Sequence, residues 1–310
     1  MSRVHDALRR AEQRVAAPGE AVGSPGAPPQ GAQTVGLAEG RVLAGVAAAA
    51  VVPGVLGQVQ EIPYTPAPEG LLLDLSRPQD APSEEFRSLR TRLNHLQNLQ
   101  PIHSVVITSP SPAEGKSFTA ANLALAESQL AGSSTLLADF DFRRPVIHNL
   151  FQIERAPGVT DFLLGNAPLP IAMRKIAGTN LYVMPAGTAV KNPLELLSLR
   201  EVKSLFEDLP KLFNWVILDS PPLLFSADAN LLGTLTDGTV LVVRIGSTTI
   251  DMVTRAMQSL CENNVLGVVV NGARAGELYS KYTYYYSRYG YEHHRPPEAE
   301  AEPEGESKPE

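Results

Sequence analysis

Residues 109–117 have the composition of a loop that binds phosphate. The loop reads Ser-Pro-Ser-Pro-Ala-Glu-Gly-Lys-Ser, and it lies between the apolar run Ser104–Thr108 and a predicted helix from Lys116 to Ala131, closed by Gly132. In this context backbone N–H groups and the helix N-terminus surround a phosphate, the lysine neutralises charge and the serine hydroxyl can bind Mg²⁺. The common pattern has glycine where this chain has Pro110, so an ordinary strand-to-helix turn is the alternative interpretation. The expected nucleotide-binding residues are Ser111, Ala113, Glu114, Gly115, Lys116, Ser117 and Phe118.

Three aspartates follow two further apolar runs. Asp139 and Asp141 follow the run that begins at Thr135, and Asp219 follows the run that begins at Trp215. Ligands of open α/β sheets bind beyond the carboxyl ends of the strands. Buried carboxylates at such positions need a cation or hydrogen bonds, and nucleotide-bound Mg²⁺ is held by one or two of them. A lone aspartate here is more often a helix cap, but three together with Gly-Lys-Ser favour nucleotide chemistry.

The elements that position these residues are predicted from about residue 83 to 275. Ser83 is expected to cap a helix that reaches Asn98, and another helix is expected from Thr249 to Asn263. Short β-branched runs alternate with helical stretches, which predicts a doubly wound α/β domain with a parallel sheet covered on both faces. The expected strands are 104–108, 135–138, 181–184, 215–218, 239–244 and 265–270.

The composition is uneven outside this domain. The chain has 310 residues, 44% of them apolar, and one cysteine, which excludes collagen-like, disulfide-stapled and wholly disordered classes and favours a reducing compartment. Residues 1–15 have the spacing of a short amphipathic helix, and residues 16–82 are rich in Ala, Gly and Pro, as in a linker. The apolar stretch Val42–Gly57 within it is too short and too interrupted for a transmembrane helix.

The C-terminal end concentrates tyrosines and then acidic residues. Seven of the nine tyrosines fall between residues 279 and 291, and residues 292–310 contain seven glutamates for a net charge of −5. We expect a disordered tail. An aromatic edge strand or a platform for nucleic acid is the alternative, but few cations accompany the rings, which argues against nucleic acid. The clustered residues are Tyr279, Tyr282, Tyr284, Tyr285, Tyr286, Tyr289 and Tyr291.

Together these residues resemble the bacterial tyrosine kinases that use a Walker-type nucleotide fold, and within them the cytoplasmic autokinases of capsule and exopolysaccharide systems. The resemblance covers about residues 83–291, and the first residues, Met-Ser-Arg-Val-His-Asp-Ala-Leu, are similar to exosortase-associated autokinases. It implies a P-loop NTPase of the partitioning-ATPase-like class. Partitioning ATPases themselves carry a second lysine where this chain has Ser111 and lack a tyrosine cluster. The motifs that carry the resemblance are the phosphate loop, Leu-Ala-Asp139-Phe-Asp141-Phe-Arg-Arg-Pro, Ile-Leu-Asp219-Ser-Pro-Pro, Glu84-Glu-Phe-Arg87-Ser-Leu-Arg90 and the tyrosine cluster.

The resemblance implies ATP-dependent autophosphorylation of the tyrosine cluster in trans, with Mg²⁺. Lys116 would hold the β- and γ-phosphates, and Asp139 would accept the tyrosine proton, although the sequence does not separate it from Asp141. The implied Mg²⁺ ligands are Ser117, Asp141 and Asp219. Arg143 and Arg144 are either phosphate ligands or surface residues.

The resemblance also implies partners and a location. Glu84, Arg87 and Arg90 lie near one face of the first helix, either as an interface that joins subunits into a ring or as a solvated face with an intrahelical pair. A transmembrane polysaccharide chain-length or adaptor protein and a phosphotyrosine phosphatase are expected partners of a cytoplasmic protein at the inner face of the membrane. The alternatives are a partitioning-type ATPase and a nucleotide-binding pseudokinase scaffold.

Overall fold

The computed structural model describes residues 54–75, 83–260 and 264–273. All described residues belong to one unit of the chain, which lies within residues 46–310. The predicted N-terminal helix, the tyrosine cluster and the acidic end lie outside the described residues.

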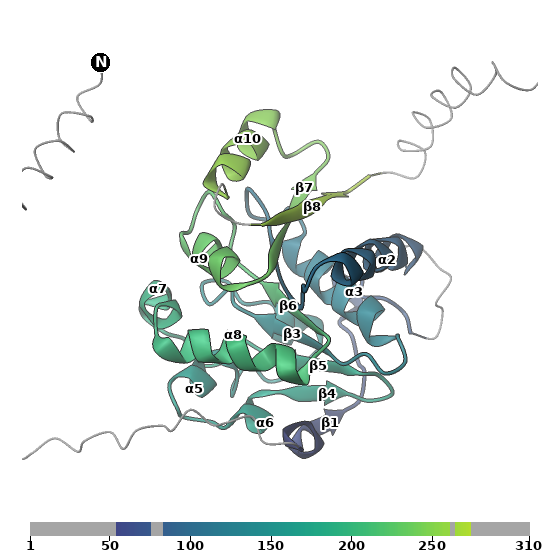
Figure 1. Cartoon of the computed structure of the whole chain (residues 1–310), viewed down its shortest axis with the longest axis vertical. Helices are drawn as coiled ribbons and strands as arrows, with labels where there is room; N and C mark the ends of the chain where they lie inside the picture. The colour runs from purple at the N-terminus through teal and green to yellow at the C-terminus, as the bar shows by residue number, and fades with distance from the viewer. Residues whose placement is uncertain (1–53, 76–82, 261–263, 274–310) are drawn as a thin grey trace, which may run out of the picture. The chain divides into compact units, whose positions relative to one another are not determined.

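The described residues contain one eight-stranded sheet with the order β1-β4-β5-β3-β6-β2-β7-β8 (Figure 1). Neighbouring strands pair in parallel except β4 and β5, which are antiparallel. The apolar runs predicted as strands all form strands, to within one residue at either end. The bounds are β1 (Gln60–Ile62), β2 (Ser104–Thr108), β3 (Thr135–Asp139), β4 (Arg174–Ile176), β5 (Leu181–Met184), β6 (Trp215–Asp219), β7 (Gly238–Arg244) and β8 (Val265–Asn271).

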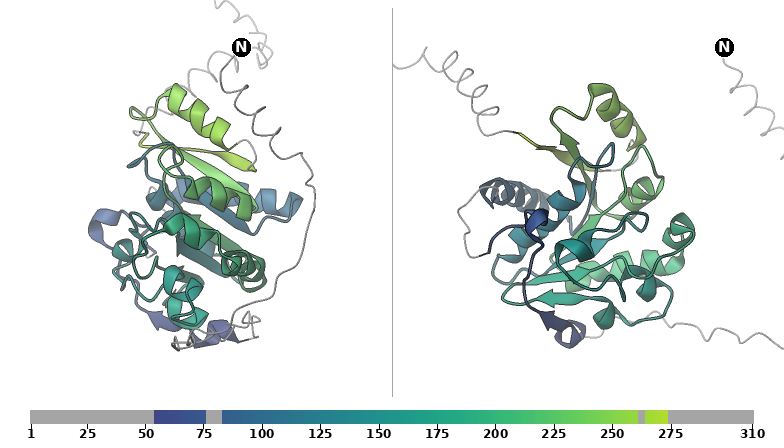
Figure 2. Two further views of the ribbon diagram at one scale, coloured as in Figure 1. Left: turned by 90° about the vertical axis from the view of Figure 1, so that its left-hand side faces the viewer. Right: turned by 180° about the vertical axis from the view of Figure 1, so that it is seen from behind.

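Helices cover both faces of the sheet, with α2 and α3 on one side and α7, α8 and α9 on the other (Figures 1 and 2). The predicted doubly wound α/β fold is confirmed. The helices are α2 (Ser83–Leu99), α3 (Lys116–Ser128), α4 (Ile147–Leu150), α5 (Val159–Leu163), α6 (Leu169–Ala172), α7 (Pro193–Leu197), α8 (Arg200–Leu212), α9 (Asp228–Leu235) and α10 (Ile250–Ser259), with 3₁₀ turns η1 (Val55–Gln58) and η2 (Pro68–Gly70).

The central strands are apolar on both faces because each face has its own core. Val105 and Ile107 of β2 pack with α2 and α3, whereas Val106 between them joins the core beneath α8. The five residues of β2 and of β6 are all buried. Continuous apolar runs, in place of an alternating pattern, are therefore what this sheet requires.

Part of the segment expected as linker is structured. Residues 54–75 contain β1, which pairs with β4 at the edge of the sheet. Asn122 of α3 accepts the backbone N–H of Leu73, and the hydroxyl of Tyr64 donates to the carbonyl of Leu73. These contacts come from distant residues, so a three-residue strand leaves no local pattern that sequence periodicity could reveal.

Three smaller expectations also differ from the structure. The helix predicted from Thr249 to Asn263 is α10, which ends at Ser259. The sheet is not wholly parallel, because β4 runs opposite to β5. Helix α3 ends at Ser128, three residues before the predicted end, and Gly132 takes a left-handed φ of 75° in the turn that follows. No helix among residues 54–75, 83–260 and 264–273 is long and apolar enough to cross a membrane.

Helix α2 is attached to α3 and β6 through a buried carboxylate. Glu127 is fully buried and accepts hydrogen bonds from the amide of Asn94, at 2.9 and 3.2 Å. The indole N–H of Trp215 donates to the other end of Asn94, and Arg90 donates to the carbonyl of Ala126. Burial raises the pKa of Glu127 to about 7, although Asn94 and Arg90 act in the opposite direction.

This raised pKa predicts that pH changes the stability of the α2–α3 contact. Between the ordinary value of 4.5 and about 7 the unfolded chain releases the Glu127 proton while the folded chain keeps it, so the free energy of unfolding falls as pH rises. Well above pH 7 both the folded and the unfolded chain have released the Glu127 proton, so this group no longer makes the free energy of unfolding depend on pH. We expect the unfolding free energy of Glu127→Gln minus that of wild type to increase by about 2 kcal/mol from pH 5 to pH 8. Urea unfolding at each pH measures this difference. Glu207→Gln, at an exposed position of α8, is the control; a pH-independent difference for Glu127→Gln would contradict the prediction.

Candidate nucleotide-binding site

The strand order places the predicted site residues together at the carboxyl ends of three central strands. Strands β3, β6 and β2 are adjacent, and their register pairs Asp139 with Asp219 and Asp219 with Ile107, two residues before the loop begins. The loop, Asp139, Asp141 and Asp219 all follow the carboxyl ends of these strands. Residues far apart in sequence therefore meet because three parallel strands end together.

Lys116 lies among the aspartates. Its ammonium nitrogen is 2.8 Å from Oδ2 of Asp141 and 3.5 Å from Oδ1 of Asp219. It also lies 3.1 Å from the hydroxyl of Ser117. The side chains of Lys116, Asp141 and Asp219 are 11%, 3% and 0% exposed. One buried cation thus faces two buried carboxylates at the start of α3.

The carboxylates are crowded beyond what one cation neutralises. Burial raises the pKa of Asp139, and the negative charge of Asp219 raises it further. Burial also raises the pKa of Asp219, although Lys116 opposes the change. Burial by itself would lower the pKa of Lys116, but Asp219 and Asp141 outweigh it, so that pKa is raised and the lysine is protonated. The site holds an excess of negative charge that a second cation would relieve.

The carboxylate of Asp139 is held by backbone amides. Its Oδ1 accepts the N–H of Asp141, and its Oδ2 accepts the N–H groups of Val146 and Ile147, all at 3.1 Å. Asp139 therefore fixes the segment that carries Asp141 and begins α4. Oδ1 accepts a single hydrogen bond in the described structure, so it retains a lone pair.

The phosphate loop is shaped by two left-handed residues. Ala113 has φ 63° and Gly115 has φ 98°, and α3 begins directly after Gly115. The backbone N–H of Ser111 donates to the carboxylate of Glu114, 2.8 Å away, so this amide is engaged within the loop. The remaining amides at the start of α3 supply the positive end of a helix, where anions bind.

The residues present fit Mg²⁺. Oδ2 of Asp219 is buried without a hydrogen-bond partner in the described residues, which leaves a charged oxygen for a cation. No three His, Cys, Asp or Glu side chains of residues 54–75, 83–260 and 264–273 are grouped to hold a metal by themselves. The site therefore suits an ion that takes one or two carboxylates, a serine hydroxyl and the oxygens of a bound phosphate.

Comparison with known proteins decides the family. The chain is 36% identical over 216 residues to the tyrosine-protein kinase YwqD of Bacillus subtilis (strain 168), and the match covers 69% of this chain and 90% of YwqD. The chain belongs to the bacterial tyrosine-protein kinases. The putative tyrosine-protein kinase CapB of Staphylococcus aureus is 29% identical to this kinase over 211 residues, which span 92% of CapB. No family model matches the kinase.

Solved structures agree with this assignment. The kinase domain of the Escherichia coli tyrosine kinase ETK superposes with a TM-score of 0.61 at 31% identity, covering 65% of the kinase and 80% of that chain. The chimerical protein CapA2B2 superposes with a TM-score of 0.63 at 31% identity, covering 71% and 96%. The fold and the family are thus supported by both sequence and structure.

Gly115 is required by both its conformation and its surroundings. A Cβ at this position would overlap the side-chain amide of Asn271, which donates to the carbonyl of Glu114 at 2.9 Å. We expect Gly115→Ala to weaken nucleotide binding at least about tenfold, because the loop or Asn271 must shift to relieve the overlap and the left-handed φ disfavours a residue with a Cβ. Titration of the kinase with a fluorescent ATP analogue measures the effect. Gly132→Ala, which has a similar left-handed φ and no atom within 4 Å, is the control; equal behaviour of the two variants would contradict the prediction.

Other predicted residues of the kinase lie away from the centre of the site. The ring of Phe118 packs edge-on against Phe86 of α2 at 5.7 Å, so only its backbone faces the loop. Arg143 forms a bidentate pair with the buried Asp228 at the start of α9, and the side chain of Arg144 is exposed. The ion pair supports a structural role for Arg143. Glu84 and Arg87 lie on α2, where they form an intrahelical pair at 3.5 Å.

Sequence reasoning missed three residues that contact the phosphate loop. Arg244 donates to the carbonyl of Ala113, Thr248 donates to the carboxylate of Glu114, and Asn271 donates to the carbonyl of Glu114. Arg244 ends β7, Thr248 follows β7 and Asn271 ends β8, and each lies more than 130 residues after the loop residue that it contacts. No local motif links them to it, because only the pairing of β2, β7 and β8 brings them together.

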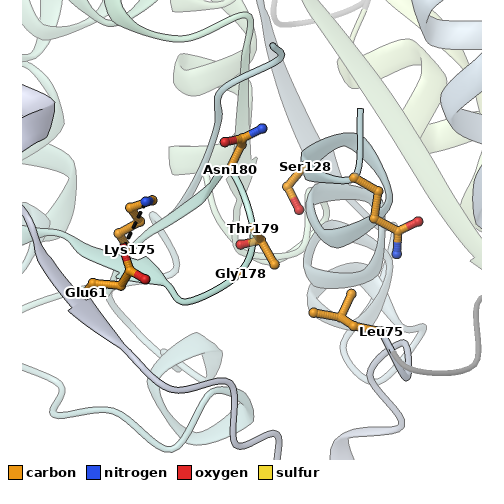
Figure 3. Close-up of a pocket in the computed structure, with 8 residues that line it drawn as sticks. Glu61, Leu75, Ser128, Lys175, Gly178, Thr179 and Asn180 are labelled. Carbon is orange, nitrogen blue, oxygen red and sulfur yellow. Dashed lines mark hydrogen bonds and ion pairs between the residues drawn. The ribbon is translucent and has the colours of Figure 1, made fainter. Parts of the chain in front are cut away.

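A separate hollow of about 570 Å³ lies away from the phosphate loop (Figure 3). Lys175 and Glu61 form an ion pair at 2.9 Å on one side of it, and Leu75 and Ser128 lie on the other side. None of the predicted site residues lines it.

Proposed function

We propose that this kinase transfers the γ-phosphoryl group of ATP to the tyrosines of its own C-terminal cluster, in trans and with Mg²⁺. The observation that carries the proposal is the protonated Lys116 of the phosphate loop, held between Asp141 and Asp219 at the carboxyl edge of the sheet. Catalysis of phosphoryl transfer depends mainly on positioning and on neutralising charge, which this arrangement suits.

Each residue has a part in the proposed reaction. Lys116 and the loop amides bind the β- and γ-phosphates, and Ser117, Asp141 and Asp219 hold Mg²⁺. The ion, when bound, neutralises charge on the phosphate oxygens and relieves the crowding of the carboxylates. Asp139 accepts the proton of the tyrosine hydroxyl; its raised pKa supports this role, whereas Asp141 is ion-paired with Lys116 at 2.8 Å.

Incubation of the full chain with Mg-ATP, followed by anti-phosphotyrosine detection, tests the reaction. We expect a tyrosine signal that disappears when the seven tyrosines of the cluster are replaced by phenylalanine. Steady ATP hydrolysis without any tyrosine signal would replace the kinase proposal with a partitioning-type ATPase. Nucleotide binding without either reaction would indicate a scaffold.

A mixture of two variants tests transfer in trans. Lys116→Met keeps the acceptor tyrosines and lacks the phosphate-loop lysine, whereas the tail variant with phenylalanine keeps the lysine and lacks the acceptors. Neither is expected to become labelled by itself. Labelling of Lys116→Met in the mixture supports transfer between chains, and its absence contradicts it.

We further propose that the kinase forms a ring through Glu84 and Arg87 of α2. Their side chains are 71% and 28% exposed. Arg90 donates to the carbonyl of Ala126 in its own chain, so its part in the ring would be to hold α2 against α3 within each subunit. Added phosphates bring about −1.5 to −2 charges each, so phosphorylated tails are expected to repel and loosen the ring. Size-exclusion chromatography of phosphorylated protein and of the phenylalanine tail variant tests this; identical oligomer sizes would contradict it.

The proposed biological setting follows from the relatives. One of them, from Klebsiella pneumoniae, is named as a putative tyrosine-protein kinase in the cps region and is 32% identical over 205 residues. We propose that the kinase regulates capsule or exopolysaccharide synthesis and export at the inner face of the membrane. Its partners would be a transmembrane chain-length or adaptor protein and a phosphotyrosine phosphatase. Co-purification from cells with and without such an adaptor tests the location.

A further inference from the structure

The phosphate loop contains a buried carboxylate where it is expected to bind anions. Glu114 is 1% exposed, and its two oxygens accept the backbone N–H of Ser111 and the hydroxyl of Thr248. Among residues 54–75, 83–260 and 264–273, Glu114 has no ion-pair partner. A negative charge beside bound phosphates is unfavourable, so its presence calls for a structural reason.

Thr248, the partner of Glu114, is held by a hydroxyl that both accepts and donates a hydrogen bond. The hydroxyl of Thr248 accepts the backbone N–H of Arg244 at 2.8 Å and donates to Glu114 at 2.5 Å. Thr249, the next residue, caps α10 by accepting the N–H of Met252. The connection between β7 and α10 is therefore anchored at both ends, and it presents Thr248 to the loop.

The same connection holds the left-handed residue of the loop. Ala113 has φ 63°, which is uncommon for a residue with a Cβ, and the guanidinium of Arg244 donates to its carbonyl at 3.0 Å. Pro110 stands where the common loop has glycine, and the left-handed residues of this loop are Ala113 and Gly115. The hydrogen bonds that Arg244 and Thr248 donate to Ala113 and Glu114 stabilise this conformation of the loop.

We propose that Glu114 and Thr248 are positioning residues for phosphoryl transfer, which hold the phosphate loop in the shape that binds ATP. This inference rests on the proposed function only in taking ATP as the ligand of the site. Without the clamp the loop occupies its binding shape for a smaller fraction of the time, and the apparent dissociation constant rises by the inverse of that fraction. Because the contact between Thr248 and Glu114 is one hydrogen bond to a carboxylate, we expect its loss to raise the apparent dissociation constant about tenfold.

The test uses the full chain and a fluorescent ATP analogue with Mg²⁺. Thr248→Val removes the hydroxyl and keeps the shape, Thr248→Ser restores the hydroxyl, and Glu114→Ala removes the carboxylate. Thr254→Val is the matched control, since the Thr254 hydroxyl donates to the carbonyl of Ile250 within α10 and the residue is exposed. The dissociation constant, the KM for ATP and kcat are measured, with circular dichroism to check folding.

We expect Thr248→Val and Glu114→Ala each to weaken the analogue about tenfold and to raise the KM for ATP more than they change kcat. The double variant should be no worse than Glu114→Ala, because Glu114→Ala already removes the bond to Thr248, and Thr248→Ser should stay within about twofold of wild type. Tighter binding by Glu114→Ala would show that the carboxylate only repels phosphate and would overturn the proposal. Multiplying effects in the double variant, or an unchanged affinity in folded Thr248→Val, would do so too.

Analogue binding does not depend on tyrosine transfer. A wild-type chain that binds the analogue but labels no tyrosine would contradict the proposed function and leave this test intact. If Thr248→Val does not fold, the comparison of Glu114→Ala with Thr248→Ser and Thr254→Val decides the question by the same criteria.

Discussion

Replacement of Lys116 by methionine is expected to reduce the rate of tyrosine phosphorylation by about 10³-fold. Removal of one group that stabilises charge in a transition state has an effect of about this size. Lys116 provides the cation that contacts both Asp141 and Asp219 among the described residues, and it is protonated at neutral pH because those carboxylates raise its pKa. Methionine keeps an unbranched side chain, one heavy atom shorter, and removes the charge. Initial rates of autophosphorylation at saturating Mg-ATP measure the effect.

The control for this variant is Lys211→Met. Lys211 lies on α8, with its ammonium 2.6 Å from Asp208 and its side chain 64% exposed, so its ion pair contributes little. We expect Lys211→Met to retain the wild-type rate. If Lys116→Met kept more than about a tenth of that rate while remaining folded, the phosphate loop would not be the catalytic centre.

Replacement of Asp219 by asparagine is expected to move activity and stability in opposite directions. The variant should lose at least about 100-fold of the phosphorylation rate, because a proposed Mg²⁺ ligand loses its charge. Without nucleotide it should unfold at higher urea concentration, with a gain of about 1–2 kcal/mol. Asp219 is fully buried, its Oδ2 has no hydrogen-bond partner in the described residues, and burial raises its pKa. Lys116 keeps its 2.8 Å contact with Asp141, so the lysine is not left unpaired.

A second aspartate provides a control with the opposite sign. Asp237 lies before β7 and accepts the N–H of His103 and both the N–H and the hydroxyl of Ser104 through one oxygen, each at 2.8 Å. Its charge is satisfied, so Asp237→Asn is expected to lower the unfolding free energy by about 1 kcal/mol and to leave phosphorylation unchanged. Destabilisation of Asp219→Asn similar to that of Asp237→Asn would mean that the Asp219 charge is accommodated without a metal ion.

Much of the fold could be predicted because the decisive signals are local. A buried parallel strand must be apolar on both faces, so runs such as Ser104–Thr108 and Leu181–Met184 appear in the sequence with the same bounds as in the structure. Strands β1 and β4 could not be found this way, because each has three residues and depends on pairing at the sheet edge. The antiparallel direction of β4 likewise follows from its pairing with β5 and not from its composition.

The same division applies to the site. Gly-Lys-Ser before a helix and aspartates at strand ends are local patterns, so the sequence by itself predicts one nucleotide site made of Lys116, Ser117, Asp139, Asp141 and Asp219. The structure brings these residues together, and their binding of nucleotide stays a prediction. The tyrosine cluster lies outside the described residues, and its role as acceptor stays a prediction.

Only the tertiary structure decided how these residues are held. It showed that Arg90 bonds within its own chain, that Glu127 is a buried carboxylate with a raised pKa, and that the hydroxyl of Thr248 donates to Glu114 of the phosphate loop. Each of these contacts joins residues from different elements of the fold. A pattern in sequence records what a residue's neighbours along the chain require, whereas a pKa or a clamp depends on neighbours that only strand order and helix packing bring into contact.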